Sequence, residues 1–174
     1  PPTGKVFIAI TFIAATQLEL LATNAGGLTG DTSDADYEHI GTDVAAHNVS
    51  AGSETAVSNK LNHNLDRMRA VLSEKDTTQY YELNIEFHEM LLKASRNSKA
   101  QAIYESLVKE MHLYRRRGLS IATNIASSIE EHTAISVAVI AGDADAARSA
   151  AHTHVTAGFA RYMKILDQDR DSTG

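Results

Sequence analysis

The sequence predicts an all-α fold. Apolar residues recur at the three- and four-residue spacing of a helix face, as in Leu61, Leu65, Met68 and Leu72. The second half of the chain is rich in alanine, the best helix former, and the whole chain holds only 2 prolines. No segment of the sequence shows the strict alternation of apolar and polar residues that is typical of a half-buried strand.

The N-terminal part combines an apolar helix with an irregular segment. Residues 6–24 form an apolar run that keeps its helical pattern through Leu18 and Leu21 and meets glycines at 26 and 27. The alternative for its first part is a signal peptide, which the continued helical pattern disfavours. Residues 25–58 are rich in glycine and acidic residues, and we expect them to be irregular or partly helical.

Three helices are expected in the middle of the chain. The first covers residues 59–74. The second covers residues 77–95, and one broad face of it holds Tyr80, Tyr81, Asn84, Phe87, His88 and Leu91. After a turn at residues 96–98, a long helix continues as far as Gly118, and its apolar positions are Ile103, Leu107, Met111 and Tyr114.

Two more helices are expected before the C-terminus. Ser128 and Glu131 have the spacing of a capping box, which predicts a helix start at Ser128. We expect that helix to stop at Gly142 and the last helix to begin after Asp143, a natural N-cap. The polar residues 168–174 are expected to form a flexible tail, which leaves residues 1–167 as a single domain.

Composition limits the function classes. The net charge is −6, so the chain is a poor candidate for gripping nucleic acid by itself. Cysteine is absent, which excludes disulfides and thiolate chemistry and leaves nitrogen and oxygen atoms as the only metal ligands. The apolar run before Glu19 is too short for a membrane span. We expect a cytoplasmic protein that does not enter a membrane.

Polar residues on apolar helix faces are the main functional signal. Asn84 and His88 stand four apart and share a helix face, and His132 aligns with apolar positions of its own helix. His152 and His154 are two apart and face nearly opposite ways, and His154 is the one on the apolar side. Buried imidazoles are costly without a partner, so this set indicates either a buried metal or a hydrogen-bonded polar core.

Neutral imidazole is a common ligand for divalent metals. Imidazoles from separate helices of a bundle could converge on one ion, for which zinc is the first expectation and nickel, manganese and iron are alternatives. Three neutral ligands leave the charge of the ion uncancelled, so an anionic small molecule, such as a carboxylate, is the natural guest at its open positions.

The same residues resemble a known family. The pattern resembles the FCD domain, the FadR-type C-terminal effector-binding domain of GntR-family transcription regulators, over roughly residues 59–167. The matching positions are Asn84-Ile85-Glu86-Phe87-His88, Ala94-Ser95-Arg96-Asn97, Glu131-His132-Thr133-Ala134-Ile135 with Ala138, Gly142-Asp143 with Ala146, and His154.

The resemblance implies an antiparallel bundle of six to seven helices around a central ligand and metal cavity. In many members one Asp and three His hold a divalent metal there, and the corresponding residues here are Asn84, His88, His132 and His154. Asn84 therefore stands where the family has an aspartate. Members bind small organic acids, and effector binding alters the DNA affinity of a winged helix-turn-helix domain that precedes the bundle.

Candidate effector ligands lie on three helices. Arg161 follows His154 by two helical turns and could bind a carboxylate bidentately. Tyr81 is a candidate stacking residue, with a place in the core as the alternative. Arg116 lies in the basic run Arg115-Arg116-Arg117, for which the alternative is a solvated helix face.

We therefore expect a non-enzymatic, dimeric effector-binding domain of a GntR-type regulator that binds a small organic acid at a divalent metal. Nothing in residues 1–60 is typical of a winged helix, so DNA would be bound only through a domain absent from this chain. Two alternatives stay open. One is a hydrolase with a three-histidine metal site, and the other is a metal-free helical protein that binds a small molecule.

Overall fold

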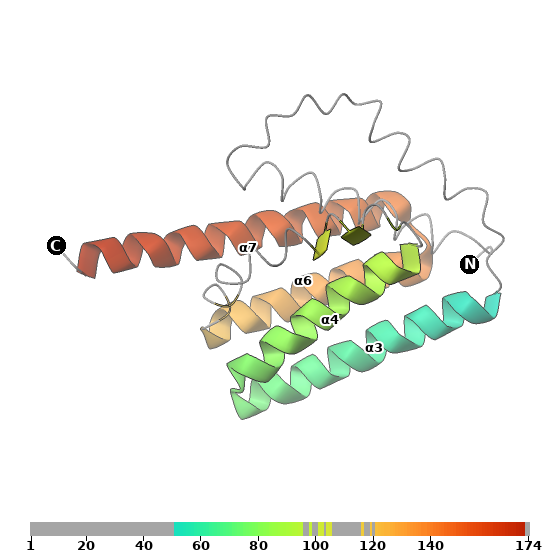
Figure 1. Ribbon diagram of the computed structural model, residues 1–174, viewed down its shortest axis with the longest axis horizontal. Helices are drawn as coiled ribbons and strands as arrows, with labels where there is room; N and C mark the ends of the chain where they lie inside the picture. Colours follow the sequence, from blue (N-terminus) through green and yellow to red (C-terminus); the bar gives the residue numbers. More distant parts are fainter. Residues whose placement is uncertain are drawn as a thin grey trace, which may run out of the picture.

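The described part of the chain is helical throughout. The computed structural model describes residues 51–95, 98, 101–102, 104–105, 116, 119 and 121–172. Within them lie four helices, α3 (Ala51–Glu74), α4 (Thr77–Ser95), α6 (Ala122–Ala141) and α7 (Ala144–Ser172), and no strand (Figure 1). The predicted all-α class is confirmed.

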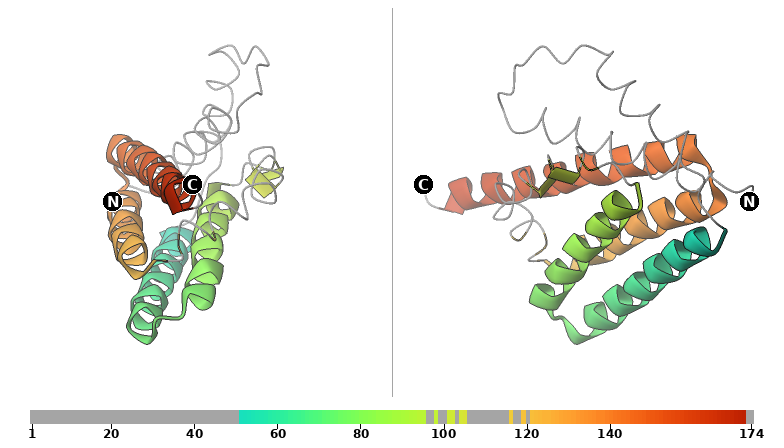
Figure 2. Two further views of the ribbon diagram at one scale, coloured as in Figure 1. Left: turned by 90° about the vertical axis from the view of Figure 1, so that its left-hand side faces the viewer. Right: turned by 45° about the vertical axis from the view of Figure 1, so that its right-hand side comes forward.

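The four helices form two antiparallel pairs. Helix α4 turns back along α3, and α7 turns back along α6 (Figures 1 and 2). The two pairs meet mainly where α3 packs against α6, and α4 also touches α6. Helix α6 therefore contacts each of the other three helices.

Apolar residues from all four helices form one core. The predicted face of α3 is confirmed, with Leu61, Leu65 and Met68 buried and Leu72 partly buried. The remaining fully buried apolar residues of this core include Phe87, Ile135, Val139, Ala147 and Ala151. The alanines of α7 leave room for a close approach to α6, because the distance between packed helices depends on the side chains at the contact.

Local sequence signals end and start several helices. Gly142 adopts a left-handed φ of 69° and ends α6, as predicted. The backbone N–H of Ala146 donates to Oδ1 of Asp143 at 3.0 Å, so the predicted N-cap of α7 is confirmed. Asp76 caps α4 in the same way, and it accepts from the backbone N–H groups of Thr78 and Gln79 at 3.0 and 2.9 Å.

The bounds of three helices differ from the expected ones, although a start at Ala51 agrees with a partly helical segment 25–58. Helix α3 begins at Ala51, within the segment expected to be irregular or partly helical. Helix α6 begins at Ala122 rather than at Ser128, because the spacing that resembles a capping box falls inside a continuous helix. Helix α7 continues to Ser172, because the segment expected to be a flexible tail has no glycine or proline before that residue.

Other expectations fall outside the described residues. These are the helix over 6–24, the irregular segment up to residue 50 and most of the long helix before Gly118, of which residues 98, 101–102, 104–105 and 116 are helical. The expected count of six to seven helices therefore stays a prediction. A search of the described part of the chain found no helix long and apolar enough to cross a membrane.

The cap of α4 gives a prediction for stability. Asp76→Ala should lower the free energy of unfolding by about 1 kcal/mol, because two backbone N–H groups lose their acceptor. Asp76→Asn should retain most of the stability, since asparagine caps nearly as well. Urea unfolding followed by circular dichroism measures both variants. An equal loss in both would show that the charge of Asp76, rather than its capping oxygen, is what matters.

Candidate metal centre

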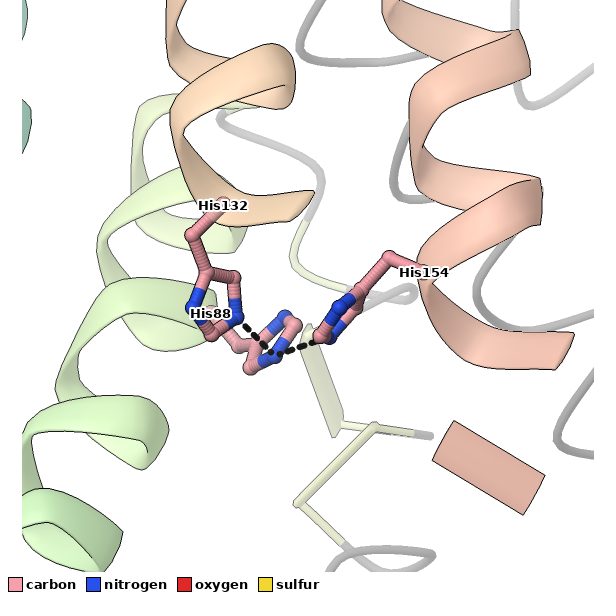
Figure 3. A group of neighbouring side chains, drawn as sticks. All are labelled: His88, His132 and His154. Atoms are coloured by element: carbon pink, nitrogen blue, oxygen red, sulfur yellow. Dashed lines mark hydrogen bonds between the residues drawn. The ribbon is translucent and has the colours of Figure 1, made fainter. Parts of the chain in front are cut away.

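Three helices each contribute one buried histidine to a single cluster. His88 comes from α4, His132 from α6 and His154 from α7, and their relative exposures are 0%, 0% and 7%. Figure 3 shows the three rings converging between these helices. His152, two residues from His154, is exposed, so the predicted difference in facing is confirmed.

The ring nitrogens are spaced like the ligands of one metal ion. The Nε2 atom of His88 lies 3.4 Å from Nε2 of His132 and 3.3 Å from Nε2 of His154 (Figure 3). A tetrahedral zinc ion with Zn–N bonds of about 2.05 Å would hold its ligand nitrogens about 3.3 Å apart. The ligand atoms of the three residues all lie within 4.8 Å of one another. The donor set therefore fits a divalent metal ion.

Glu131 orients the ring of His154. Its Oε2 lies 2.8 Å from Nδ1 of His154. Because an ionised carboxylate only accepts hydrogen bonds, Nδ1 of His154 donates, and in the neutral ring Nε2 then keeps its lone pair. That lone pair belongs to the nitrogen that faces the cluster. A carboxylate that orients a histidine in this way is typical of metal sites.

Arg161 holds Glu131 in turn. Its two terminal nitrogens lie 2.6 and 2.9 Å from the two carboxylate oxygens, and both side chains are only 16% exposed. Burial alone would raise the pKa of Glu131, but the hydrogen bonds from Arg161 and His154 outweigh it and hold the pKa below its usual range. Glu131 is therefore ionised at neutral pH, as its role as an acceptor requires.

Asn84 borders the cluster on the side of α4. Its residue is 4% exposed, and its amide nitrogen lies 3.4 Å from Nε2 of His132. The nitrogen and oxygen of an amide exchange places when the group rotates by 180°, so the same position can present an oxygen to the ion. Such an oxygen brings no charge. The three imidazoles and this amide together would leave the full charge of a divalent ion uncancelled.

A row of polar residues continues from Asn84 and His132 toward the N-terminal ends of their helices. Tyr80 and Ser128 come one turn earlier on α4 and α6, with exposures of 0% and 1%. Burial raises the pKa of Tyr80 to about 12, and the neighbouring Ser128 and Asn84 side chains oppose that rise. Neither hydroxyl has a hydrogen-bond partner in the described part of the chain.

The structure brings some of the predicted site residues together and leaves others apart. Asn84 and the three histidines come together, and in the described part of the chain Glu131 links Arg161 to His154. Tyr81 is 6% exposed and belongs to the apolar core, and Arg116 is exposed. The expected contact of Tyr81 and Arg116 with an effector stays a prediction.

Sequence reasoning missed the role of Glu131. The capping-box interpretation gives Glu131 a role only at the start of a helix. The structure instead joins it to His154 and Arg161 on α7. The seven-residue spacing of His154 and Arg161 was a usable signal, because two donors on one helix face need an acceptor opposite them.

Comparisons with known proteins agree with this arrangement. The FCD domain family matches residues 40–157, which include α4, α6, His88, His132 and His154. Searches of curated proteins and of solved structures gave no match. The family match covers well over half of the chain, and the chain belongs to the FCD domain family.

Proposed function

We propose that this chain is the effector-binding domain of a GntR-type transcription regulator and that it binds a small organic acid at a divalent metal ion. The observation that carries the proposal is the convergence of three buried Nε2 atoms from three helices. Membership of the FCD domain family supports the regulatory role. His88, His132 and His154 would hold the ion, zinc by preference, and Asn84 would supply an amide oxygen beside them.

The charge of the site supports an acidic effector. Among the described residues, no carboxylate joins the three imidazoles. The closest acidic partner of the cluster, Glu131, is already neutralised by Arg161. When bound, the ion would supply a Lewis-acidic centre with a net positive charge, which attracts an anion. A carboxylate meets both needs of the site, because it is negatively charged and its oxygen atoms can bind a divalent ion.

The contacts between α6 and α7 offer a way for effector binding to change how these helices are arranged. His154 and Arg161 both bind Glu131, so the site ties two turns of α7 to α6. An effector that binds one arrangement of these helices better than another shifts the population toward it. In a cytoplasmic homodimer, such a shift would change the spacing of winged-helix domains on DNA, and DNA would be bound through those domains alone.

Among the residues that the structure describes, none favours the hydrolase alternative. A metal-bound water near neutral pH would need a general base within reach. Glu131 is the acidic residue nearest in the network, but Arg161 and His154 occupy both of its oxygens. It serves to orient His154 and is poorly suited to take a proton.

Metal content tests the site directly. The purified wild-type chain, dialysed against zinc and then against metal-free buffer, should retain about one ion, because three neutral imidazoles bind it together. His88→Ala and His132→Ala should each retain far less, and His152→Ala, at an exposed position, should match the wild type. Elemental analysis measures all four. Equal metal in the four proteins, or none in the wild type, would refute the metal site.

Glu131 offers a second test. Glu131→Gln should weaken zinc binding by about ten- to hundredfold, as is usual when the residue that orients a ligating histidine is changed. Glu130→Gln is the matched control, because Glu130 is the preceding residue and is exposed. Competition with a coloured chelator gives both dissociation constants. Identical affinities for the two variants would mean that His154 needs no support from Glu131.

A further inference from the structure

Asn84 can pair with the histidine cluster in two ways. Its Nδ2 lies 3.4 Å from Nε2 of His132, and both side chains are buried. An amide has hydrogens on its nitrogen and lone pairs on its oxygen. It can therefore donate to the ring nitrogen or, after a rotation of 180°, turn an oxygen toward a metal ion beside that nitrogen. An ionised carboxylate at this position could do only the second, because it has no hydrogen to donate.

The tautomer of His154 decides which hydrogen bond His88 makes within the cluster. Because Nδ1 of His154 donates to Glu131, its Nε2 carries a lone pair. Nε2 of His88 lies 3.3 Å from that lone pair, so the contact is a hydrogen bond when His88 carries its hydrogen on Nε2. That hydrogen is then used at His154 and is not available to His132, whose Nε2 lies 3.4 Å away.

The amide of Asn84 supplies the hydrogen that Nε2 of His132 then accepts. With one hydrogen bond from Asn84 to His132 and one from His88 to His154, the cluster is paired while all three rings stay neutral. Buried polar groups that are paired avoid the free-energy cost of an unsatisfied donor or acceptor. The cluster therefore has a second satisfied arrangement, besides the one in which an ion binds the three lone pairs.

We propose that Asn84 makes the metal ion exchangeable, so that the domain takes up and releases zinc without unfolding. This inference rests on the proposed function. Metal binding requires that the hydrogen of His88 moves from Nε2 to Nδ1 and that the amide of Asn84 rotates. Two hydrogen bonds are lost, and the oxygen ligand gained is neutral. Zinc availability is then an input to the regulator in addition to the effector.

The wild-type chain provides the first test. After a strong chelator has removed its metal, the chain should keep its far-ultraviolet circular dichroism spectrum and unfold cooperatively on heating, because the cluster is hydrogen-bonded without an ion. Added zinc should raise Tm, and chelator should reverse the rise. Loss of helix on chelation is the behaviour of a site whose metal is needed for folding, and it would overturn the proposal whether or not any variant folds.

Asn84→Asp is the sharper test, because it keeps the shape of the side chain and removes its hydrogens. This variant should bind zinc at least about tenfold more tightly than the wild type in competition with a chelator, since its oxygen ligand is charged. Without metal, it should melt at a lower temperature than the wild type, and saturating zinc should remove or reverse that difference. Asn62→Asp, at an exposed position of α3, should match the wild type in each measurement.

The outcomes separate this inference from the metal site on which it rests. An unchanged zinc affinity of Asn84→Asp, or an unchanged melting temperature of its metal-free form, would overturn the role of Asn84 and leave the metal site intact. Absence of zinc binding by both the wild type and Asn84→Asp would remove the metal site, and the inference with it.

Discussion

The burial of three imidazoles around one point is the constraint on which the rest of the site depends. A ring nitrogen that faces another ring nitrogen needs a shared proton or a shared metal ion. His88 faces two such neighbours at 3.4 and 3.3 Å, and one proton can bridge only one of them. A single divalent ion bonds to all three lone pairs at once. An ion held there would satisfy buried ring nitrogens from three helices at once.

This constraint extends outward through a chain of paired charges. His154 presents its lone pair inward because Glu131 accepts the hydrogen on the other side of its ring, and Glu131 stays ionised because Arg161 holds both of its oxygens. Helix α6 carries Glu131 beside His132, while α7 carries the other two residues. The orientation of the His154 ring and the packing of α6 against α7 thus depend on the same buried carboxylate.

Much of the fold follows from local signals. The apolar spacing of Leu61, Leu65 and Met68 predicted the buried face of α3, and Gly142 and Asp143 predicted the boundary between α6 and α7. The start of α6 was predicted wrongly, because the Ser128–Glu131 spacing also occurs inside a helix. Only tertiary contacts distinguish the two cases: Ser128 is buried, and Glu131 is bound to α7. A sequence pattern within one helix carries no information about the helix that packs against it.

The sequence alone determined that the chain is helical and that His154 rather than His152 faces inward. It also determined the metal-site candidates, which are Asn84, His88, His132 and His154. Helical periodicity was sufficient for this, because it decides which residues share a face. The tertiary structure alone decided that the imidazole nitrogens meet within ligand distance and that Arg161 binds Glu131. These are distances between different helices, which depend on how α4, α6 and α7 pack and not on the spacing of residues within any one of them.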